Sequence, residues 1–528
     1  MHDILQDLIL GELVMRIEEV LANHLVSSNN FHVYILHHRT SGARISFLQI
    51  ADSSGSSKYQ EVHSDAVTYE DNQYDSPKSW IDAVHTLLKR TQDTNPQLLS
   101  HTYSICVSGT SASCLMVDAN TGDVHRPPKM YDYDITQTKS SSPTAHIQVQ
   151  DLIDIHAPPN HVVRGSTSAL SKLLHYHYIK PFSQDHNQEI VLAHQSEYVA
   201  TQIFRSNPKQ CGAGPHANRR SYVSDWHNVL KLGYDVQKLE YPTWIYACLD
   251  EANISRNVLP QVVSPGQVIS KISSNVSKLY GIPESAVVVG GTTDSNAAFF
   301  AAAAGGTSAG IPYGTAVTSL GSTLALKMWS RTFVQDSERG VYSHRVPIFG
   351  NQKTDSEHGM GEEAWLVGGA SNVGCAILRQ EQFSNDELSE LSTNMDVSTD
   401  SPYKYYPLVK KGERFPVADG NKHPLLEPKP DSRQEYLKGI LQGISQVEEK
   451  GWNVLGALGS DPPFPSIVWT AGGGSRNDAW LSMRERLLNR SKDGDNVGET
   501  KKVRVRRADN AEASFGAAIL AASNFQST

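Results

Sequence analysis

The sequence predicts an α/β protein of more than one domain, and two observations support this prediction. Apolar strands that run into glycine- and hydroxyl-rich turns alternate with helical segments, as in residues 103–107 before the turn 108–111 and residues 286–289 before the turn 290–294. The chain has 528 residues, and domains commonly hold roughly 100–200, so two to four domains are expected.

The composition is that of an ordinary globular protein, and it excludes several classes. With 39% hydrophobic and 20% charged residues, extensive disorder, collagen and coiled coil are excluded. The 47 Lys and Arg against 56 Asp and Glu give a net charge of −9, which lacks the basic footprint of a nucleic-acid-binding protein. No run approaches the roughly 18 apolar residues of a membrane span. We therefore expect no nucleic-acid partner and no membrane partner.

The five cysteines indicate a reducing compartment. They include no C-x-x-C pair, which argues against structural zinc and against a disulfide framework: Cys106, Cys114, Cys211, Cys248 and Cys375. We expect a cytoplasmic protein without a metal centre built from protein ligands.

Residues 1–30 are predicted to form an N-terminal helical extension. Apolar residues at helical spacing alternate with Glu12, Glu18 and Glu19, which indicates an acidic amphipathic helix. A secretory signal begins with positive charge, and a transit peptide is rich in Arg and Ser with few acids, so neither is expected here.

From residue 31 onward, the two halves of the chain show the same order of strands, turns and helices. In the first half we expect strands over 31–36 and 43–50, helices over 168–176 and 271–280, and a buried small-residue helix over 297–304. In the second half we expect strands over 315–320, 324–329, 466–470 and 503–506, and helices over 480–488 and 511–522. Residues 384–404 and 414–433 are polar and contain proline, so we expect surface excursions there.

Several of the turns that follow strands suggest a phosphate-binding function. Glycine lets backbone amides approach an anion closely, and Ser and Thr hydroxyls add donors. The chain contains neither a G-x-x-x-x-G-K-[ST] loop nor a G-x-G-x-x-G fingerprint, so P-loop and Rossmann sites are excluded. A nucleotide site would have to be assembled from turns distributed over two lobes.

Asp294 is the sharpest single candidate for chemistry. It follows a run of valines and the turn Gly291-Thr292-Thr293, and it precedes the small-residue helix. A carboxylate at a strand end that faces a cleft suits general-base work on a hydroxyl. The alternative, which the local pattern leaves open, is that Asp294 only caps the helix that follows it.

These residues resemble the FGGY carbohydrate kinases. The segments that match, in order, are Gly291 to Ser295, Thr318 to Thr323, Gly368 to Gly374, Tyr405 to Leu408, Gly412 to Pro416, Ala471 to Asn477 and Glu512 to Ala518. In the first half, Thr40 to Arg44, His194-Gln195, Ser224 to Asn228 and Lys231 to Tyr234 fit as well. The chain is most similar to the xylulose-kinase-like D-ribulose kinases of photosynthetic organisms, and the resemblance covers residues 31–522.

The resemblance implies a two-lobed fold of the actin, hexokinase and Hsp70 kind, with ribonuclease-H-like lobes and a cleft between them. It implies a sugar-binding lobe over residues 31–297 and an ATP-binding lobe over residues 298–528. The implied reaction is phosphorylation of a ketopentose, D-ribulose before D-xylulose, to its 5-phosphate with ATP and Mg²⁺. Sugar and ATP are the implied partners, a homodimer stays open, and so does a plastid location if the authentic N-terminus differs.

The resemblance also implies roles for individual residues. Asp294 would be the general base. The implied ATP-binding residues are Thr40, Ser41, Gly42, Arg44, Gly321, Ser322, Thr323, Gly472, Gly473, Gly474 and Asn477. The implied substrate-binding residues are Gly109, Thr110, Ser111, Asp132, Asp134, Thr293 and Asp294.

The sequence departs from the family pattern in its first phosphate loop. Where the family has Asp-Phe-Gly-Thr, this chain has His37-His38-Arg39-Thr40. An imidazole is a poor replacement for a carboxylate that organises Mg²⁺, and a side chain at a glycine position blocks the approach of phosphate. The sugar-loop motif Tyr-Asn-Asp is also altered, to Tyr131-Asp132-Tyr133-Asp134, which leaves the identity of the sugar open.

Two explanations of the altered loop remain open. The chain is either a true but impaired kinase, or a non-catalytic relative that binds sugar or nucleotide. Alternatively, residues 1–39 are not the authentic N-terminus, because the match to the family begins abruptly at Thr40.

Overall fold

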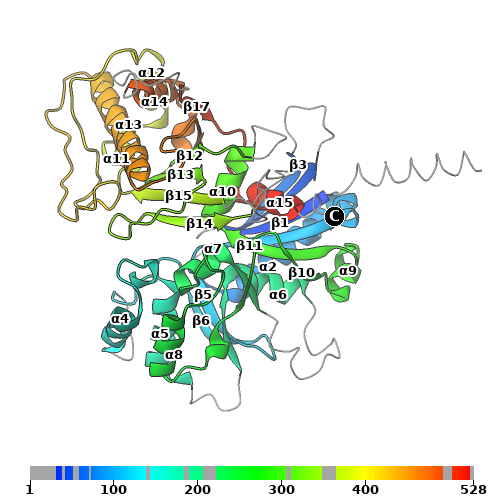
Figure 1. Ribbon diagram of the computed structural model, residues 1–528. Coiled ribbons are helices and arrows are strands. Elements are labelled where there is room, and N and C mark those ends of the chain that lie inside the picture. The colour runs from blue at the N-terminus through cyan, green and yellow to red at the C-terminus, as the bar shows by residue number, and fades with distance from the viewer. Residues whose placement is uncertain are drawn as a thin grey trace, which may run out of the picture.

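Two six-stranded sheets divide the chain into two lobes in the computed structural model (Figure 1). The structure describes residues 31–38 (as backbone), 42–50, 59–70, 73–137, 143–182, 189–205, 222–304, 311–347, 364–490 and 502–523. The predicted extension over residues 1–30 and the loop residues Arg39, Thr40 and Ser41 lie outside these ranges.

The first sheet has the strand order β10-β11-β4-β1-β2-β3. Its strands are β1 (Phe31–His38), β2 (Gly42–Ile50), β3 (Tyr59–Thr68), β4 (Thr102–Gly109), β10 (Val268–Lys271) and β11 (Val287–Thr293). Strands β1, β4 and β11 are parallel, so their carboxyl ends share one edge of the sheet. Successive side chains of β4 point to opposite faces of the sheet, and accordingly Ile105 and Val107 pack in one apolar cluster and Cys106 in another. Both faces of the sheet are therefore covered.

Helices and a smaller sheet complete the first lobe. Helices α2 (Pro77–Thr94) and α6 (Gln195–Phe204) cover one face of the first sheet. An antiparallel sheet of β5 (Cys114–Asp118), β6 (Val124–Lys129) and β7 (Ile190–His194) packs with α4 (Ala145–His156), α5 (Ala169–Ile179) and α8 (Thr243–Glu251). Shorter elements fill the remainder: α3 (Pro96–Ser100), β8 (Val223–Asp225), α7 (Trp226–Val229), the 3₁₀ turn Leu230–Leu232, β9 (Gln261–Val263) and α9 (Ser274–Tyr280).

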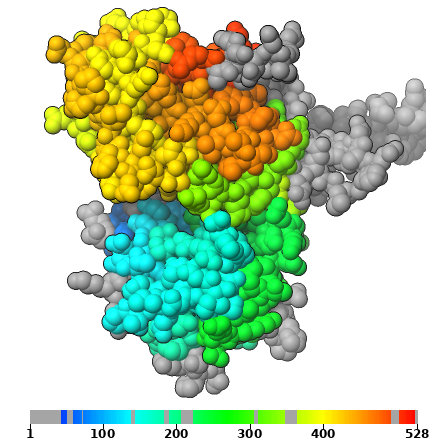
Figure 2. Space-filling view, turned by 60° about the vertical axis from the view of Figure 1, so that its left-hand side comes forward, coloured from blue at the N-terminus to red at the C-terminus, as the bar shows by residue number. Residues whose placement is uncertain are grey.

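The second sheet has the order β14-β15-β13-β12-β16-β17. Its strands are β12 (Thr315–Leu320), β13 (Leu324–Ser330), β14 (Tyr342–Val346), β15 (Ala364–Ser371), β16 (Ile467–Ala471) and β17 (Arg504–Arg507). Its helices are α11 (Ala376–Gln380), α12 (Asn385–Thr393), α13 (Arg433–Ala457) and α14 (Asp478–Arg490). Figure 2 shows this lobe, in yellow and orange, above the cyan and green segments of the first lobe, with a furrow along their boundary.

Two small-residue helices, α10 (Asp294–Ala303) and α15 (Ala513–Ser523), lie between the two sheets (Figure 1). A Cβ on Gly516 would stand 1.7 Å from the Ala297 carbonyl oxygen, so only glycine permits this close approach of the helices. Helix α15 also packs on the first sheet, where the Ser514 and Ser46 hydroxyls are 2.7 Å apart. A lobe boundary at residues 297 and 298 therefore falls inside α10, and the last helix of the chain packs against the first lobe.

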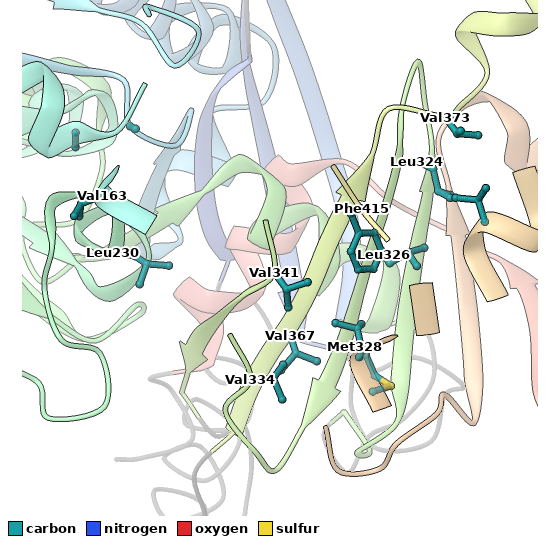
Figure 3. Packing of buried hydrophobic residues seen from close by; sticks show 14 of the residues in the cluster. Val163, Leu230, Leu324, Leu326, Met328, Val334, Val341, Val367, Val373 and Phe415 are labelled. Carbon is teal, nitrogen blue, oxygen red and sulfur yellow. The ribbon is translucent and has the colours of Figure 1, made fainter. Parts of the chain in front are cut away.

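The surface excursion predicted over residues 414–433 is wrong at its beginning. Phe415 is fully buried in the core of the second lobe, beside Leu326 (Figure 3). The glycines of two distant segments make room for its ring, since a Cβ on Gly369 or Gly451 would lie 2.7 or 2.8 Å from it. The predicted excursion over 384–404 includes the helix α12, which lies largely at the surface. The helix predicted over 271–280 begins only at Ser274, because Lys271 ends β10.

A buried ion pair between α13 and α14 packs against the second sheet. Arg484 on α14 donates to both carboxylate oxygens of Glu448 on α13, at 2.6 and 2.7 Å. Arg484 also donates to the Thr470 hydroxyl at 2.7 Å, and the Thr318 hydroxyl donates to Glu448 at 2.6 Å. The network therefore joins two helices to the neighbouring strands β12 and β16.

Candidate active site between the two lobes

The register of the first sheet brings the ends of three strands that precede predicted loops to one edge. Ser108 on β4 is paired with Leu36 on β1 and with Thr292 on β11, and Thr293 is paired with Gly109. Because these strands are parallel, the carboxyl end of β1, the turn that begins at Gly109 and the first turn of α10 all lie at the same edge. Ligands of open α/β sheets bind at such carboxyl edges.

Asp294 begins α10 directly at the end of β11. Its side chain is half-buried, and its Oδ1 accepts a hydrogen bond from the Ser295 amide at 2.7 Å. Thr293, and not Asp294, is the residue at the N-cap, and its side chain makes no capping hydrogen bond. Asp294 thus contributes to the helix start, but it does not occupy the capping position that the alternative interpretation assigned to it.

Lys327 of β13 reaches from the second sheet to this first turn of α10. Its ammonium group donates to the Ser295 hydroxyl at 3.1 Å and to the side-chain oxygen of Asn296. Burial lowers the pKa of Lys327 to about 7, although the charge of Asp294 acts in the opposite direction. The one sequence signal of Lys327 is a lone charge in the otherwise apolar strand Leu324–Ser330, and Lys327 was not among the predicted site residues.

Two hydroxyls at the same edge are buried without a partner among the described residues. They are Ser108 Oγ at the end of β4 and Thr293 Oγ1 at the end of β11. A buried polar group without a hydrogen bond costs stability, commonly about 1–3 kcal/mol. Their placement fits a ligand that carries hydroxyl groups.

The other predicted substrate-binding residues differ in what their side chains contact. The Thr110 hydroxyl is buried and contacts Gln195 Oε1 at 3.0 Å and the Ser113 hydroxyl at 2.5 Å, so internal contacts occupy it. Ser111 is half-exposed, and a Cβ on Gly109 would lie 3.0 Å from the Ser196 amide. The structure therefore gives Thr110 a role inside the protein.

Asp132 and Asp134 lie on one turn but have different surroundings. Asp132 is exposed, and its charge acts on the buried ammonium group of Lys172. Asp134 accepts hydrogen bonds from the amide and hydroxyl of Thr136, at 2.9 and 2.7 Å. Burial raises the pKa of Asp134, but these bonds and one from Ser166 outweigh that effect, so its pKa is lowered. Asp134 is thus engaged in shaping its own turn.

The predicted phosphate turn of the second lobe joins β12 to β13. Gly321, Ser322 and Thr323 lie between the paired residues Leu320 and Leu324. The segment that follows β15 supports this turn, since the Cys375 amide donates to the Gly321 carbonyl at 2.8 Å. A Cβ on Gly374 would lie 2.5 Å from the Ser322 carbonyl oxygen, so this support requires glycine.

The triple glycine follows β16 at the same edge of the second sheet, because Ala471 is paired with Ser319. Gly472 has a φ of 82°, and a Cβ on it would lie 2.7 Å from the Leu320 carbonyl oxygen. A Cβ on Gly474 would lie 2.7 Å from the Trp480 ring, whereas one on Gly473 would meet nothing within 4 Å. Packing therefore accounts for Gly472 and Gly474 but not for Gly473.

Gly473 lines a cavity of about 950 Å³ between α11, α12 and the beginning of α14. Phe383, Leu388 and Leu441 give the cavity an apolar side. Asn477 also lines it, but its amide donates to the Ser392 hydroxyl at 2.7 Å and its Oδ1 accepts from the Trp480 amide at 2.9 Å. A cavity of this size, with an open glycine at its border, fits a nucleoside.

Arg379 adds a cation that the sequence analysis did not identify. It is exposed on α11, lines the cavity, and donates to the Ser322 hydroxyl at 3.1 Å. The guanidinium group therefore lies between the cavity and the predicted phosphate turn.

The first phosphate loop is described only in part. Thr40 and Ser41 lie outside the described residues, as does Arg39. Gly42 is buried, and a Cβ on it would lie 1.9 Å from the Val67 carbonyl oxygen on β3. Arg44 forms an ion pair of 3.5 Å with Glu512, just before α15. The structure thus gives Gly42 and Arg44 contacts within the protein.

The described residues do not form a protein-held magnesium site. No group of three or more His, Cys, Asp and Glu side chains suited to a metal occurs among them. The charge of a second lysine, Lys231, acts on Lys327 next to Asp294. Mg²⁺ prefers carboxylate ligands, and a lysine cannot serve as one. The described residues therefore offer no Mg²⁺ site built from protein ligands alone.

Side chains of both lobes meet near the site. The His227 imidazole contacts the Thr292 hydroxyl at 2.6 Å and the Arg345 carbonyl oxygen of β14 at 2.7 Å. Burial lowers the pKa of His227 to about 3, so its ring is neutral at pH 7. The Arg345 guanidinium donates to the Val236 and Gln237 carbonyls at 3.1 and 3.0 Å. These contacts join β14 of the second sheet to the first lobe beside β11.

No protein-family model matches the chain. Among the described residues, no helix combines the length and the apolar character that crossing a bilayer requires.

Solved structures of sugar kinases are similar to most of the chain. A xylulose kinase from Rhodospirillum rubrum matches with a TM-score of 0.69 at 15% identity, over 94% of this chain and 90% of that one. A xylulose kinase from Bifidobacterium adolescentis matches with a TM-score of 0.67 at 16% identity, over 94% and 93%. The Plasmodium falciparum glycerol kinase with ADP matches with a TM-score of 0.69 at 13% identity, over 94% and 90%. The chain therefore has the two-lobed, actin- and hexokinase-like α/β fold on which these sugar kinases are built.

Proposed function

We propose that the protein is a kinase that transfers the γ-phosphoryl group of ATP to a ketopentose, D-ribulose before D-xylulose, and forms the 5-phosphate. The observation that carries this proposal is the position of Asp294. Its carboxylate lies at the carboxyl edge of the first sheet, and a side chain of the second sheet reaches the same turn. A phosphoryl acceptor held by one lobe and a donor held by the other would meet there.

In the proposed reaction, Asp294 acts as the general base. Its carboxylate takes the proton from the primary hydroxyl of the sugar as the oxygen attacks the γ-phosphorus. The new bond joins the sugar oxygen to phosphorus, the bond from phosphorus to the β–γ bridging oxygen breaks, and ADP leaves. The proton on Asp294 then passes to water. Catalysis of this kind rests on positioning and charge, so closure of the two lobes around the reactants would supply much of it.

On the nucleotide side, the cavity beside Gly473 would receive the adenosine. Gly321, Ser322 and Thr323 would line the phosphates, with Arg379 beside them. Gly472, Gly474 and Asn477 would act mainly by shaping the cavity, because their contacts lie within the protein. Thr40, Ser41, Gly42 and Arg44 belong to the proposed site through the resemblance of their loop. Mg²⁺ would enter as its complex with ATP.

On the sugar side, the unpartnered hydroxyls of Ser108 and Thr293 are the groups best placed to bind sugar hydroxyls. Ser111 and Asp132 are accessible and would add contacts, with Gly109 providing close approach of the backbone. Thr110 and Asp134 would act indirectly, by holding the two turns in shape.

A second function is favoured by one specific observation, the loop His37-His38-Arg39-Thr40. It lacks the carboxylate and the glycine of the family pattern. Losing one well-placed electrostatic partner commonly costs about 10²–10³ in rate, so losing both would leave a protein that binds sugar or nucleotide without turnover.

A coupled assay of ADP release over a panel of pentoses separates the two functions. The kinase predicts ADP release that a ketopentose stimulates, and a loss of at least about 10²-fold in Asp294→Asn. Asp250→Asn, an exposed carboxylate in an ion pair on α8, is the matched control and should keep wild-type activity. Turnover that is unchanged in Asp294→Asn would overturn the role of the base. Binding of ATP or sugar in calorimetry, without turnover for any pentose, would establish the second function instead.

A further inference from the structure

Lys327 is a cation that the proposed reaction does not yet use. Along β13, Leu324, Leu326 and Met328 point into the core of the second lobe. Lys327 and Trp329 therefore point to the opposite face, and the Trp329 ring stacks on Phe299 of α10 with a centroid distance of 6.1 Å. The alternation of the strand thus directs the Lys327 side chain at α10.

The ammonium group of Lys327 contacts the two residues that follow Asp294. It donates to Ser295 Oγ at 3.1 Å and to Asn296 Oδ1. Asn296 is fully buried, and its amide nitrogen has no partner among the described residues. The orientation of the Asn296 side chain is therefore set by Lys327, since the amide oxygen must face the ammonium group.

Charged and titratable groups of four elements act on this ammonium group. Asp294 on α10 favours its charged form, and Lys231 on the 3₁₀ turn Leu230–Leu232 disfavours it. The rings of His227 on α7 and His344 on β14 also lie within its electrostatic reach. Burial lowers the pKa of both imidazoles, so both are neutral at pH 7, and Asp294 supplies the negative charge that favours the ammonium form.

We propose that Lys327 is a positioning residue for phosphoryl transfer, whose ammonium group fixes the first turn of α10 through Ser295 and Asn296 and holds the Asp294 side chain as an ordered carboxylate. This inference rests on the proposed function and adds to it a link between the lobes. Lys327 belongs to the sheet of the nucleotide-binding lobe, and the base begins at the sheet of the sugar-binding lobe. The contact therefore aligns acceptor and donor, and it weakens when the ammonium group loses its proton, because a neutral amine donates weaker hydrogen bonds.

The kinetic test compares Lys327→Met with Lys327→Arg. Methionine keeps the apolar stem without the charge, and a misplaced base commonly costs about 10²-fold, so kcat should fall by that factor while the KM for ATP changes less than threefold. Arginine keeps the charge and should retain most of the activity. Lys89→Met, an exposed lysine on α2, is the control and should behave as wild type.

The pH profile separates positioning from a merely structural role. The kcat/KM of the wild type should fall on the alkaline side, because burial lowers the pKa of Lys327 to about 7 and a neutral amine holds the turn less firmly than the ammonium group does. In Lys327→Arg this alkaline limb should move up by two or more pH units, because a guanidinium stays charged. Wild-type kcat in Lys327→Met, or an unmoved limb in Lys327→Arg, would overturn the proposal.

A measurement that needs no activity distinguishes failure of this inference from failure of the proposed function. In protein labelled with ¹³C at lysine Cε, the Lys327 resonance is assigned by its loss in Lys327→Arg and titrated in wild type and in Asp294→Asn. Removing the opposite charge of Asp294 should lower the pKa of Lys327 further. An unchanged titration would refute the coupling even in an active kinase. A shifted titration in a protein without turnover would refute only the kinase.

Discussion

Replacing Arg484 by methionine should destabilise the second lobe by about 3–5 kcal/mol. Arg484 and Glu448 are 0% and 1% exposed, and the substitution removes two charge-assisted hydrogen bonds from the carboxylate. Among the described residues, Glu448 would keep the bond from the Thr318 hydroxyl alone, and Thr470 would lose a donor. The large effect follows because a buried charge is left without its partner, not because the intact pair is strongly stabilising.

Urea unfolding monitored by tryptophan fluorescence measures this effect, since Trp480 is buried four residues before Arg484 on the same helix. Arg490→Met is the matched control, because Arg490 pairs with Asp400 at the surface and should contribute less than about 1 kcal/mol. The double variant Glu448→Leu, Arg484→Met should be more stable than Arg484→Met alone. A loss below about 1 kcal/mol in Arg484→Met, or a double variant that is less stable than the single one, would refute this reasoning.

Two further predictions follow from the glycine turn and from the interface between the lobes. Gly473→Val should raise the Kd for ATP in calorimetry about tenfold or more with unchanged stability, because the new Cβ meets open space at the border of the cavity. Gly474→Ala should instead destabilise the protein by about 1–3 kcal/mol, because the new Cβ meets the Trp480 ring. The reverse pattern, with normal ATP binding in Gly473→Val, would remove the cavity as the nucleotide site. His227 should by itself lower the free energy of unfolding by about 2 kcal/mol when the pH falls from 7 to 5. The reason is that its pKa of about 3 in the folded state lies below its pKa in the unfolded chain, so the unfolded chain binds the proton first. His227→Asn should flatten this slope in denaturant titrations at several pH values, and an equal slope in both proteins would contradict the burial of a neutral ring.

Much of the fold could be predicted from the sequence, because its strands and helices have clear local signals. The small-residue segment 297–304 was expected to be a closely packed helix, and α10 confirms it through the contact of Gly516 with Ala297. The strand over 324–329 and the turn before it were confirmed as well. Local periodicity is enough to predict a helix or strand where the segment packs through one regular face.

The errors arise where burial or function depends on segments far apart in the chain. Phe415 follows a polar stretch, and its burial depends on Gly369 and Gly451, which no local pattern connects to it. The contact of the Thr110 hydroxyl with Gln195, 85 residues later, is likewise not visible in any local pattern, and the predicted role of Thr110 in sugar binding stays a prediction. Lys327 was missed because its partner Asn296 lies 31 residues earlier and across the boundary between the lobes.

The central claim is that a carboxylate at the junction of the two lobes accepts a proton from a sugar hydroxyl during phosphoryl transfer. A single-turnover experiment with [γ-³²P]ATP and D-ribulose, in wild type and in Asp294→Asn, tests it most directly. The account predicts labelled pentose phosphate in the wild type and transfer at least about 10²-fold slower in the variant, with an unchanged Kd for ATP. Transfer at equal rates in the two proteins would contradict it.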